Sequence, residues 1–391
     1  MYIVKAFAQK GYHVNVLTPK QGEMARRLGE TGACLLPLKK KRFNSIELES
    51  HAFETRKPLT WKTPLLMLHE VLKILIGVAV VSRAIRRTNP RLVYINEHVA
   101  MQASLAARIH RIPSVIQIRS LLLNGAFGIR RFLFSRLILR FNDRIFAITE
   151  SEAQQLQPRN SEEKKVKVIG EFFSSLDAQV PGVRECRAAL GLPLDKRIVT
   201  MLGGVEEIKG TLVFLRAAEL VTNTFSKVFF VLAGTHQTLN ERMRSYFSAC
   251  AVIAERLKQN GWFVDLGQIL GTMELINASD VIVAPSMLTH FSRPVIESWG
   301  LGKPVVCSKT EHMRNLVDHG CDGLLFEIGD HKMLAKCLLE LLVNRKLRER
   351  MGKEGKNKVE ERFNAKANTA AILEECNALV EGKTSLLVQN S

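Results

Sequence analysis

The segment Val281-Ile-Val-Ala-Pro-Ser-Met-Leu-Thr-His-Phe-Ser-Arg-Pro-Val-Ile-Glu-Ser-Trp-Gly-Leu-Gly-Lys-Pro-Val-Val306 carries the pattern strand, loop, helix, strand. The apolar run at 281–284 is typical of a buried parallel strand. Pro294 suits the first turn of a helix, and Gly302 ends that helix. The loop 287–293 therefore follows a strand and precedes a helix, which is where α/β folds bind phosphate groups.

The rest of the chain alternates strands and helices in the same way. Short apolar runs predict strands in the first half at 12–17, 91–96, 114–119 and 144–149. In the second half they predict strands at 198–202, 228–233, 262–266, 281–284, 304–308 and 323–326. Helical patterns fill the intervals, including 99–110, 211–222, 239–260 and 332–344. This alternation predicts parallel sheets with helices on both faces.

Polar segments divide the chain. The stretch 158–165 and a linker at 171–196 separate the two halves, and a final helix begins near Phe363. We therefore expect an N-terminal domain at 1–170, a C-terminal domain at 171–362 and a C-terminal helix at 363–391.

Positive charge is concentrated in the first half. The chain of 391 residues has a formal net charge of +18. Residues 1–150 hold 25 Lys and Arg against 9 Asp and Glu, a net +16, whereas the rest holds 31 against 29, a net +2. A basic first domain indicates an anionic partner. The chain has no zinc-finger, RNA-recognition or base-stacking signature, so nucleic acid is disfavoured.

Two basic clusters stand out. One is Lys39–Arg42. The other is 128–141, where four arginines interleave with Phe and Leu. A basic amphipathic helix at 128–141 suits a membrane surface rich in acidic lipid; the alternative is a solvated helix whose apolar side is core. The apolar stretch 64–82 carries charged residues and is too short to span a bilayer, so it predicts a core or interfacial helix.

The seven cysteines are scattered and form no Cys-x-x-Cys pair. They therefore indicate neither a zinc site nor a disulfide framework, and a reducing cytoplasm fits them best. The first residues lack the long apolar core of a secretory signal.

Four residues carry the candidate chemistry of the second half. Gly203 and Gly204 follow the strand at 198–202 and would let the backbone approach a ligand closely. Lys209, at the start of the next helix, could place a positive charge on a diphosphate. Glu297, one turn into the helix that follows the loop 287–293, could reach a pair of ribose hydroxyls.

These segments resemble the family 4 retaining glycosyltransferases, which have the GT-B fold, and the similarity extends over nearly the whole chain. The family motif is Glu, seven residues, Glu. Glu297 matches the second glutamate, which binds the nucleotide ribose, and Thr289 stands where the first positions the donor sugar. Lys209 matches a lysine that holds the donor diphosphate together with an arginine, and Gly204 stands at the arginine position.

The resemblance implies further site residues. The family binds donor phosphates and sugar through backbone amides of the loop that here contains His290, Phe291, Ser292 and Arg293. Arg293 could supply part of the charge that is absent at Gly204.

Arg119 stands where many members carry a histidine near the donor sugar. Arg119 would stabilise a leaving phosphate or bind an anionic acceptor; the alternative is a strand-end arginine paired with an acidic neighbour. His98, also at a strand end, is a weaker candidate. The segment Asn277–Asp280 resembles a family Ala-x-x-Asp and is interpreted as architectural.

The family implies two Rossmann-like, doubly wound domains with a cleft between them. It also implies transfer of a sugar, with retention, from a nucleotide-diphosphate-sugar donor to a glycan or lipid-linked acceptor. No metal ion or cofactor is expected, because lysine, arginine and helix amides stabilise the leaving diphosphate. Together with the basic first domain, this favours bacterial surface polysaccharide synthesis, by a cytoplasmic enzyme bound peripherally to the inner face of the membrane.

Two other functions stay open. A non-catalytic scaffold of the same fold at the membrane is favoured by Thr289, by Gly204 and by the apparent absence of the first strand. A sugar-nucleotide 2-epimerase of the same fold would need acidic and histidine residues for elimination chemistry. Family members also begin with a strand and a glycine-rich turn, whereas this chain opens inside the following helix, at 2–10. Either the true start lies further upstream, or part of the site has been lost.

Overall fold

The computed structural model describes residues 2–18, 23–38, 63–122, 128–173, 180–235, 241–289 and 292–389. The chain forms two compact units. Unit 1 comprises Met1–Phe172 and Ala365–Ser391, and unit 2 comprises Phe173–Asn364. Inside unit 2, Phe173 pairs with Asn364 in a parallel bridge, so the two points where the chain enters and leaves this unit lie side by side.

Unit 2 contains a six-stranded sheet in which every strand pair is parallel. Its strands are β7 (Arg197–Leu202), β8 (Val228–Ala233), β9 (Phe263–Asp265), β10 (Val281–Ala284), β11 (Val305–Ser308) and β12 (Gly323–Phe326). The spatial order is β12-β11-β10-β7-β8-β9. The chain builds outward from β7 in one direction and then, from β10, in the other. This is a doubly wound sheet with its switch point between β7 and β10.

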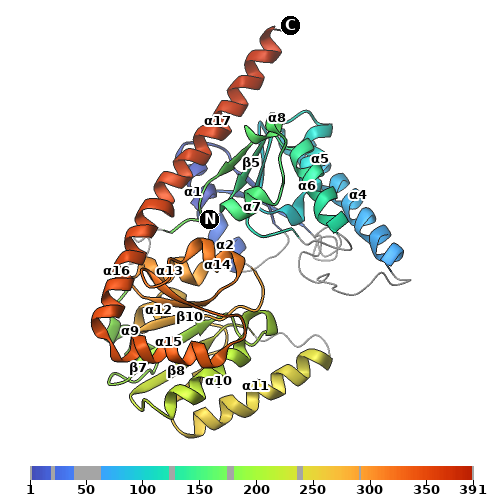
Figure 1. The fold of residues 1–391 in the computed structure, drawn as a ribbon. Helices are drawn as coiled ribbons and strands as arrows, with labels where there is room; N and C mark the ends of the chain where they lie inside the picture. Colours follow the sequence, from blue (N-terminus) through green and yellow to red (C-terminus); the bar gives the residue numbers. More distant parts are fainter. Residues whose placement is uncertain are drawn as a thin grey trace. The chain divides into compact units, whose positions relative to one another are not determined.

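Helices cover both faces of the unit 2 sheet (Figure 1). The helices that pack on one face are α10 (Thr211–Thr222), α11 (Glu241–Gln259) and α15 (His331–Val343). Those on the other face are α9 (Val183–Ala189), α12 (Thr272–Ala278), α13 (Arg293–Gly300), α14 (Glu311–Leu316) and α16 (Arg345–Arg362). Because every strand is covered on both sides, the strands are continuous apolar runs such as β10, in which all four residues are buried.

Unit 1 contains two separate parallel sheets among its described residues. One pairs β1 (Asn15–Thr18) with β2 (Cys34–Pro37). The other has the order β3-β4-β5-β6, formed by β3 (Val93–Ile95), β4 (Ser114–Ile118), β5 (Arg144–Ala147) and β6 (Val166–Val168). The sequence predicts a parallel sheet in this half, and the structure divides it in two.

Two groups of helices enclose the four-stranded sheet. On one side lie α4 (Thr63–Thr88), α5 (Gln102–Ile109) and α6 (Ile129–Phe141). On the other side α1 (Tyr2–Gln9) and α17 (Ala365–Gln389) contribute to a shared apolar cluster. The remaining helices are α2 (Glu23–Gly29), α7 (Glu150–Gln154), α8 (Asn160–Glu163) and the short η1 (His98–Ala100). The last helix of the chain thus completes the core of the first unit.

Most predicted elements are confirmed, and β8, β10, β12 and α10 have the predicted bounds. The predicted linker at 171–196 is wrong in part, because it contains α9, whose residue Cys186 packs in a core cluster with Leu275 of α12. The polar stretch 158–165 lies within unit 1 and contains α8. The sequence missed β2, β6 and α16. The first two contain exposed residues, Cys34 in β2 and Lys167 and Val168 in β6, so they lack the buried apolar run that marks strands such as β10.

Candidate functional site

The switch point of unit 2 brings two loops together. The loop after β7 contains the predicted Gly203, Gly204 and Lys209, and the loop after β10 leads to α13 and Glu297. Because β7 and β10 are adjacent and parallel, both loops leave the same edge of the sheet. In doubly wound sheets, ligands bind in the crevice outside these carboxyl ends.

The glycine loop after β7 adopts a backbone conformation that other residues rarely take. Gly203 and Gly204 have φ angles of 143° and 74°. Their amides both donate to the carbonyl of Ala233 at the end of β8, at 2.8 and 3.0 Å. A Cβ on Gly204 would lie 2.0 Å from the carbonyl oxygen of Thr235. The glycine at the family's arginine position is therefore a requirement of this backbone, and a larger residue there would clash.

The loop after β7 is also fixed against the loop after β10. Gly210, which follows η3 (Glu207–Lys209), has φ of 76°, and a Cβ there would lie 1.9 Å from the carbonyl oxygen of Pro285. The amide of Met287 donates to the carbonyl of Ile208 at 2.9 Å. The Thr211 hydroxyl donates to the Gly204 carbonyl at 2.9 Å. The loops 203–211 and 285–287 are therefore held together at the sheet edge, and we refer to this pair of loops with the start of α13 as the ledge.

Lys209 lies over the glycine loop. Its Cγ and Cδ atoms are 3.4 Å from the position that a Cβ of Gly203 would occupy. Burial lowers the pKa of the Lys209 ammonium, and the charge of Glu206 opposes that shift. A diphosphate beside this ammonium would favour the charged form, so the side chain is suited to bind an anion.

The helix α13 presents Glu297 and Arg293 at the same edge. Ser292 is its N-cap, and no side-chain hydrogen bond caps the helix. Pro294 has no amide hydrogen and the Val295 amide donates to the Ser292 carbonyl at 3.1 Å, so this end offers an anion mainly the positive end of the helix dipole. Arg293 Nε lies 3.3 Å from Glu297 Oε1. Glu297 is 17% exposed and Arg293 is 56% exposed. Thr289 is half-buried in the preceding loop.

His290 and Phe291, which the sequence also predicts for this site, lie outside the described residues, as does the basic cluster at 39–42.

Close helix packing fixes the position of α13. A Cβ on Gly355 of α16 would lie 2.0 Å from the Trp299 ring of α13. Lys358 Nζ lies 5.1 Å from the same ring and 2.7 Å from Asp318, and it pairs with the buried Asp322. Trp299 Nε1 donates to the Asp322 carbonyl at 2.8 Å. These contacts hold the helix that carries Glu297.

Asp280 has the architectural role that the sequence predicts. It lies before β10, and its Oδ2 accepts from the Ile198 amide and from Arg187, both at 2.8 Å. These contacts tie the amino ends of β7 and β10, at the edge opposite to the candidate site.

Arg119 lies at the carboxyl end of β4 in unit 1. Its Nη1 donates to Asn96 Oδ1 at 3.5 Å, and its Nη2 pairs with Glu171. The Arg119 side chain is 26% exposed and that of Glu171 is 4% exposed. The paired arginine that the sequence held as the alternative is therefore present, while about a quarter of its side-chain surface is exposed.

Further acidic and histidine residues gather at the same edge of the unit 1 sheet. The buried His98 is hydrogen-bonded through Nδ1 to Glu97 Oε1 at 2.5 Å. Glu152, which is fully buried, accepts from the Thr149 hydroxyl. Burial raises the pKa of Glu152 to about 7; the Thr149 hydrogen bond opposes this shift, and the Glu97 charge adds to it.

The sequence prediction missed Glu97, Glu152 and Glu171 as members of this group. Each follows a strand of one parallel sheet within a few residues, and that shared position is the signal that could have found them.

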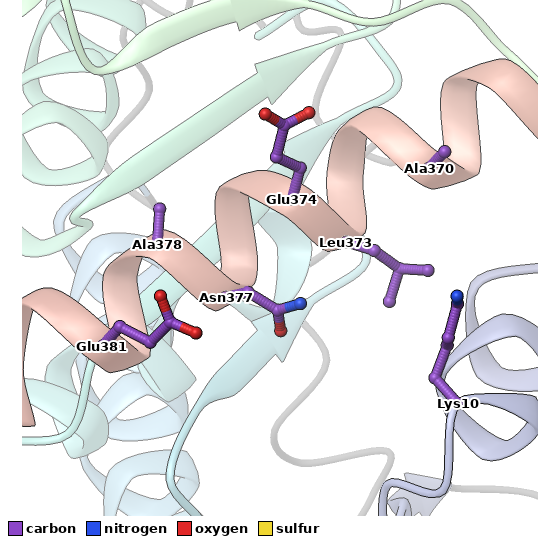
Figure 2. Close-up of a pocket in the computed structure, with 7 residues that line it drawn as sticks. All are labelled: Lys10, Ala370, Leu373, Glu374, Asn377, Ala378 and Glu381. Atoms are coloured by element: carbon purple, nitrogen blue, oxygen red, sulfur yellow. The ribbon is translucent and has the colours of Figure 1, made fainter.

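Unit 1 also has an open hollow of about 420 Å³ between α1 and α17. Figure 2 shows that its lining comes from the C-terminal helix, with Lys10 on the facing side. The hollow contains none of the predicted site residues. Among the helices of the described ranges, none is both long enough and apolar enough to cross a bilayer.

Two family models match the chain in adjacent ranges. The glycosyl transferases group 1 model matches residues 183–358. The glycosyl transferase 4-like domain model matches residues 1–170. Together the two models take in most of both units.

Curated relatives match at moderate identity. The lipopolysaccharide core biosynthesis glycosyltransferase LpsD of Rhizobium meliloti is 27% identical over 54% of this chain and 59% of its own length. The capsular polysaccharide biosynthesis glycosyltransferase CapM of Staphylococcus aureus is 24% identical over 67% of this chain and 70% of its own length. The chain spans a little under three fifths of the lengths of LpsD and of the related LpsE.

Solved structures confirm the predicted fold class. Anabaena HepE, crystallised with UDP and glucose, superposes with a TM-score of 0.74 at 19% identity, over 96% of this chain and 94% of that one. Sucrose-phosphate synthase from Thermosynechococcus elongatus gives a TM-score of 0.71 at 16% identity, over 97% and 92%. The fold is GT-B, with two Rossmann-like domains. From both family matches and this fold, the chain belongs to the group 1 glycosyltransferases.

Proposed function

We propose that the protein transfers a glycosyl residue, with retention at the anomeric carbon, from a nucleotide-diphosphate-sugar to a glycan or lipid-linked acceptor in surface polysaccharide synthesis. The observation that carries the proposal is the ledge at the switch point of unit 2, where the glycine loop, Lys209 and the start of α13 meet at one sheet edge. Relatives named for lipopolysaccharide and capsule synthesis support the acceptor class.

Each group at the ledge has a distinct role in the proposal. The positive end of the α13 dipole and the Lys209 ammonium bind the donor diphosphate and stabilise the charge that develops as it leaves. Glu297 accepts hydrogen bonds from the ribose hydroxyls. Arg293 orients Glu297 in the unliganded protein. It also adds positive charge beside the diphosphate, which Gly204 cannot supply because its backbone leaves no room for a side chain.

The electrostatic mechanism calls for no metal ion or cofactor, and no side-chain nucleophile is assigned. The leaving phosphate accepts the proton of the acceptor hydroxyl as the new glycosidic bond forms on the same face of the sugar. Arg119 of unit 1 contributes to phosphate or acceptor binding through the part of its guanidinium that is exposed. The basic charge of unit 1 supports a location at the cytoplasmic face of the membrane.

The test is release of nucleotide diphosphate from UDP-, GDP- and ADP-sugars, with purified protein and a membrane extract as the acceptor source. We expect release from one donor, and about a tenfold or larger fall in that release for Glu297→Gln, because a hydrogen bond to a charged group is lost. Glu349→Gln is the matched control, because Glu349 is also paired with an arginine one turn away but lies exposed on α16. Chelation by EDTA should leave the rate unchanged, and NMR should show the product anomer retained.

Other outcomes favour the remaining functions. No release from any donor, with no thermal shift by any nucleotide, would favour a non-catalytic scaffold. Interconversion of the donor sugar without diphosphate release would favour a 2-epimerase, and Glu97, His98 and Glu152 would then be the residues to substitute first.

A further inference from the structure

Helix α4 of unit 1 turns an apolar row away from the core. The row consists of Leu68, Val71, Leu72, Leu75 and Ile76, each between 44% and 59% exposed. Their spacing of three and four places them on one face of the helix. Val81 and Ile85, on the opposite face, are buried. The exposed row is therefore additional to the apolar face that holds α4 in the fold.

Helix α6 repeats this arrangement. Ile129, Phe132 and Leu133 lie on its outer face and are 48–55% exposed. The opposite face packs Phe134 and Ile138 into the core. The basic amphipathic helix predicted at 128–141 thus has apolar residues on both faces, and only one of them is used for packing.

The two exposed rows belong to one surface of unit 1. Both α4 and α6 pack against α5, and Ile74 of α4 packs on the same cluster as Ile138 of α6. Figure 1 shows the three helices together. Each helix precedes a strand of the same parallel sheet, so α4 and α6 run in the same direction. Since the apolar rows occupy the N-terminal halves, both rows lie toward the carboxyl edge of the sheet, where Arg119 lies.

Arginines extend the same outer faces. Arg83, Arg86 and Arg87 are exposed in the last turns of α4. On α6, Arg140 is exposed, and Arg136 lies 5.4 Å from the Phe132 ring. The apolar rows therefore stand beside positive charge, in the half of the chain that carries a net +16 from 25 basic and 9 acidic residues.

We infer that the outer faces of α4 and α6 form one lipid-binding surface that lies on a bilayer rich in anionic lipid. The apolar rows would enter the boundary between headgroups and acyl chains, and the arginines would contact lipid phosphates. A second copy of the chain fits this surface less well, because association would bring two arginine-rich faces together. The inference deepens the proposed function, since a lipid-linked acceptor would then be presented at the Arg119 edge.

The test is co-sedimentation of the full chain with vesicles of phosphatidylcholine alone and of phosphatidylcholine with one third phosphatidylglycerol. We expect binding to the anionic vesicles that weakens as salt is raised. Leu72→Glu with Leu75→Glu should lower the partition coefficient about tenfold or more, because two apolar side chains no longer enter the interface. The matched control is Val252→Glu with Val343→Glu, which alters two apolar residues of unit 2 that are somewhat more exposed than Leu72 and Leu75.

A second pair of variants tests the charge. Replacing Arg83, Arg86 and Arg87 by glutamine should lower binding to anionic vesicles about tenfold or more at low salt and leave binding to neutral vesicles unchanged. Lys332, Lys336 and Lys353, replaced by glutamine, make the same change in charge on exposed residues of unit 2. Circular dichroism spectra of all four variants should match the wild type.

Three results would overturn the inference. They are equal vesicle binding by the α4 variants and their unit 2 controls, no binding by the wild type, and a dimer that the α4 variants dissociate in sedimentation velocity. Hydrolysis of the donor in solution, measured as diphosphate release without vesicles, tests the proposed function separately from vesicle binding. A wild type that binds vesicles through α4 but releases no diphosphate would refute only the proposed function, and the converse would refute only the lipid-binding surface.

Discussion

The two units hold their sheet-edge residues by different means. In unit 2, backbone contacts fix the edge, since Gly204 and Gly210 each leave no room for a Cβ against a neighbouring loop. In unit 1, side-chain charges fix it, through the pair of Arg119 with Glu171 and the contact of His98 with Glu97. Every donor presents the same diphosphate, which suits contacts fixed by the backbone of unit 2. The contacts of unit 1 depend on particular side chains and are therefore sensitive to substitution.

The largest expected effect comes from breaking the ledge of unit 2. Gly204→Ala should lower the free energy of unfolding of unit 2 by about 4 kcal/mol, because a left-handed backbone is strained and the new Cβ meets the Thr235 carbonyl. Urea unfolding can be followed by tryptophan fluorescence, since Trp262 and Trp299 both lie in unit 2.

Gly191→Ala is the control for Gly204→Ala. Gly191 has φ of 66°, but a Cβ there meets no described atom within 4 Å. Gly191→Ala should lower the free energy of unfolding by about 1 kcal/mol, through backbone strain alone. Equal losses in the two variants would show that the contact with Thr235 does not matter.

The next effect tests the charges of unit 1 by pH. The pKa of Glu152 is raised from 4.5 to about 7 by burial, so the protonated form stabilises the folded state. That contribution is fully present below about pH 4.5 and is lost as pH rises through 7, at a cost of about 3 kcal/mol. Glu152→Gln should therefore be more stable than the wild type at pH 8 and similar to it at pH 4.5.

Glu150→Gln, on the exposed side of the same helix, is the control for Glu152→Gln and should leave the pH dependence unchanged. Urea midpoints from circular dichroism at both pH values measure the difference. A Glu152→Gln variant with the same pH dependence as the wild type would show that Glu152 is ionised in the folded protein.

A third prediction sharpens the role of the unit 2 ledge. Lys209→Met keeps the apolar stem that packs on Gly203 but removes the ammonium, so it should weaken nucleotide diphosphate binding about ten- to a hundredfold without changing stability. Isothermal titration calorimetry with the diphosphate of the accepted donor measures the change. Lys332→Met, an exposed lysine of the same unit, should bind as the wild type does. Unchanged affinity in Lys209→Met would remove this lysine from the site.

The smallest expected effect concerns Arg119. A double-mutant cycle with Arg119→Gln and Glu171→Gln should give a coupling of about 1 kcal/mol in stability, because the arginine is partly exposed and solvent screens the pair. If Arg119 acts only by balancing the charge of Glu171 at the edge of the unit 1 sheet, the double variant should recover the activity that Arg119→Gln loses. If Arg119 also contacts phosphate or acceptor, turnover stays low in the double variant.

The sequence predicted unit 2 more completely than unit 1. Long apolar runs bounded by Gly and Pro located β8, β10 and β12 with their observed bounds, because a strand covered on both faces must be apolar throughout. The strands β2 and β6, which are partly exposed rather than covered on both faces, gave no such signal. The helix α4 was predicted from the stretch 64–82, but with apolar residues on two faces the sequence did not show which face packs in the core.

By itself the sequence determined the alternation of strands and helices, the switch-point loops and the candidate residues Lys209 and Glu297, because these depend on local patterns. Only the tertiary structure decided that this backbone requires a glycine at position 204, since the clash is with Thr235, thirty-one residues further along. Tertiary structure also decided that Arg119 meets Glu171 and that two apolar rows remain exposed on one surface of unit 1. Contacts between residues distant in sequence leave no periodic trace in the chain, so packing alone reveals them.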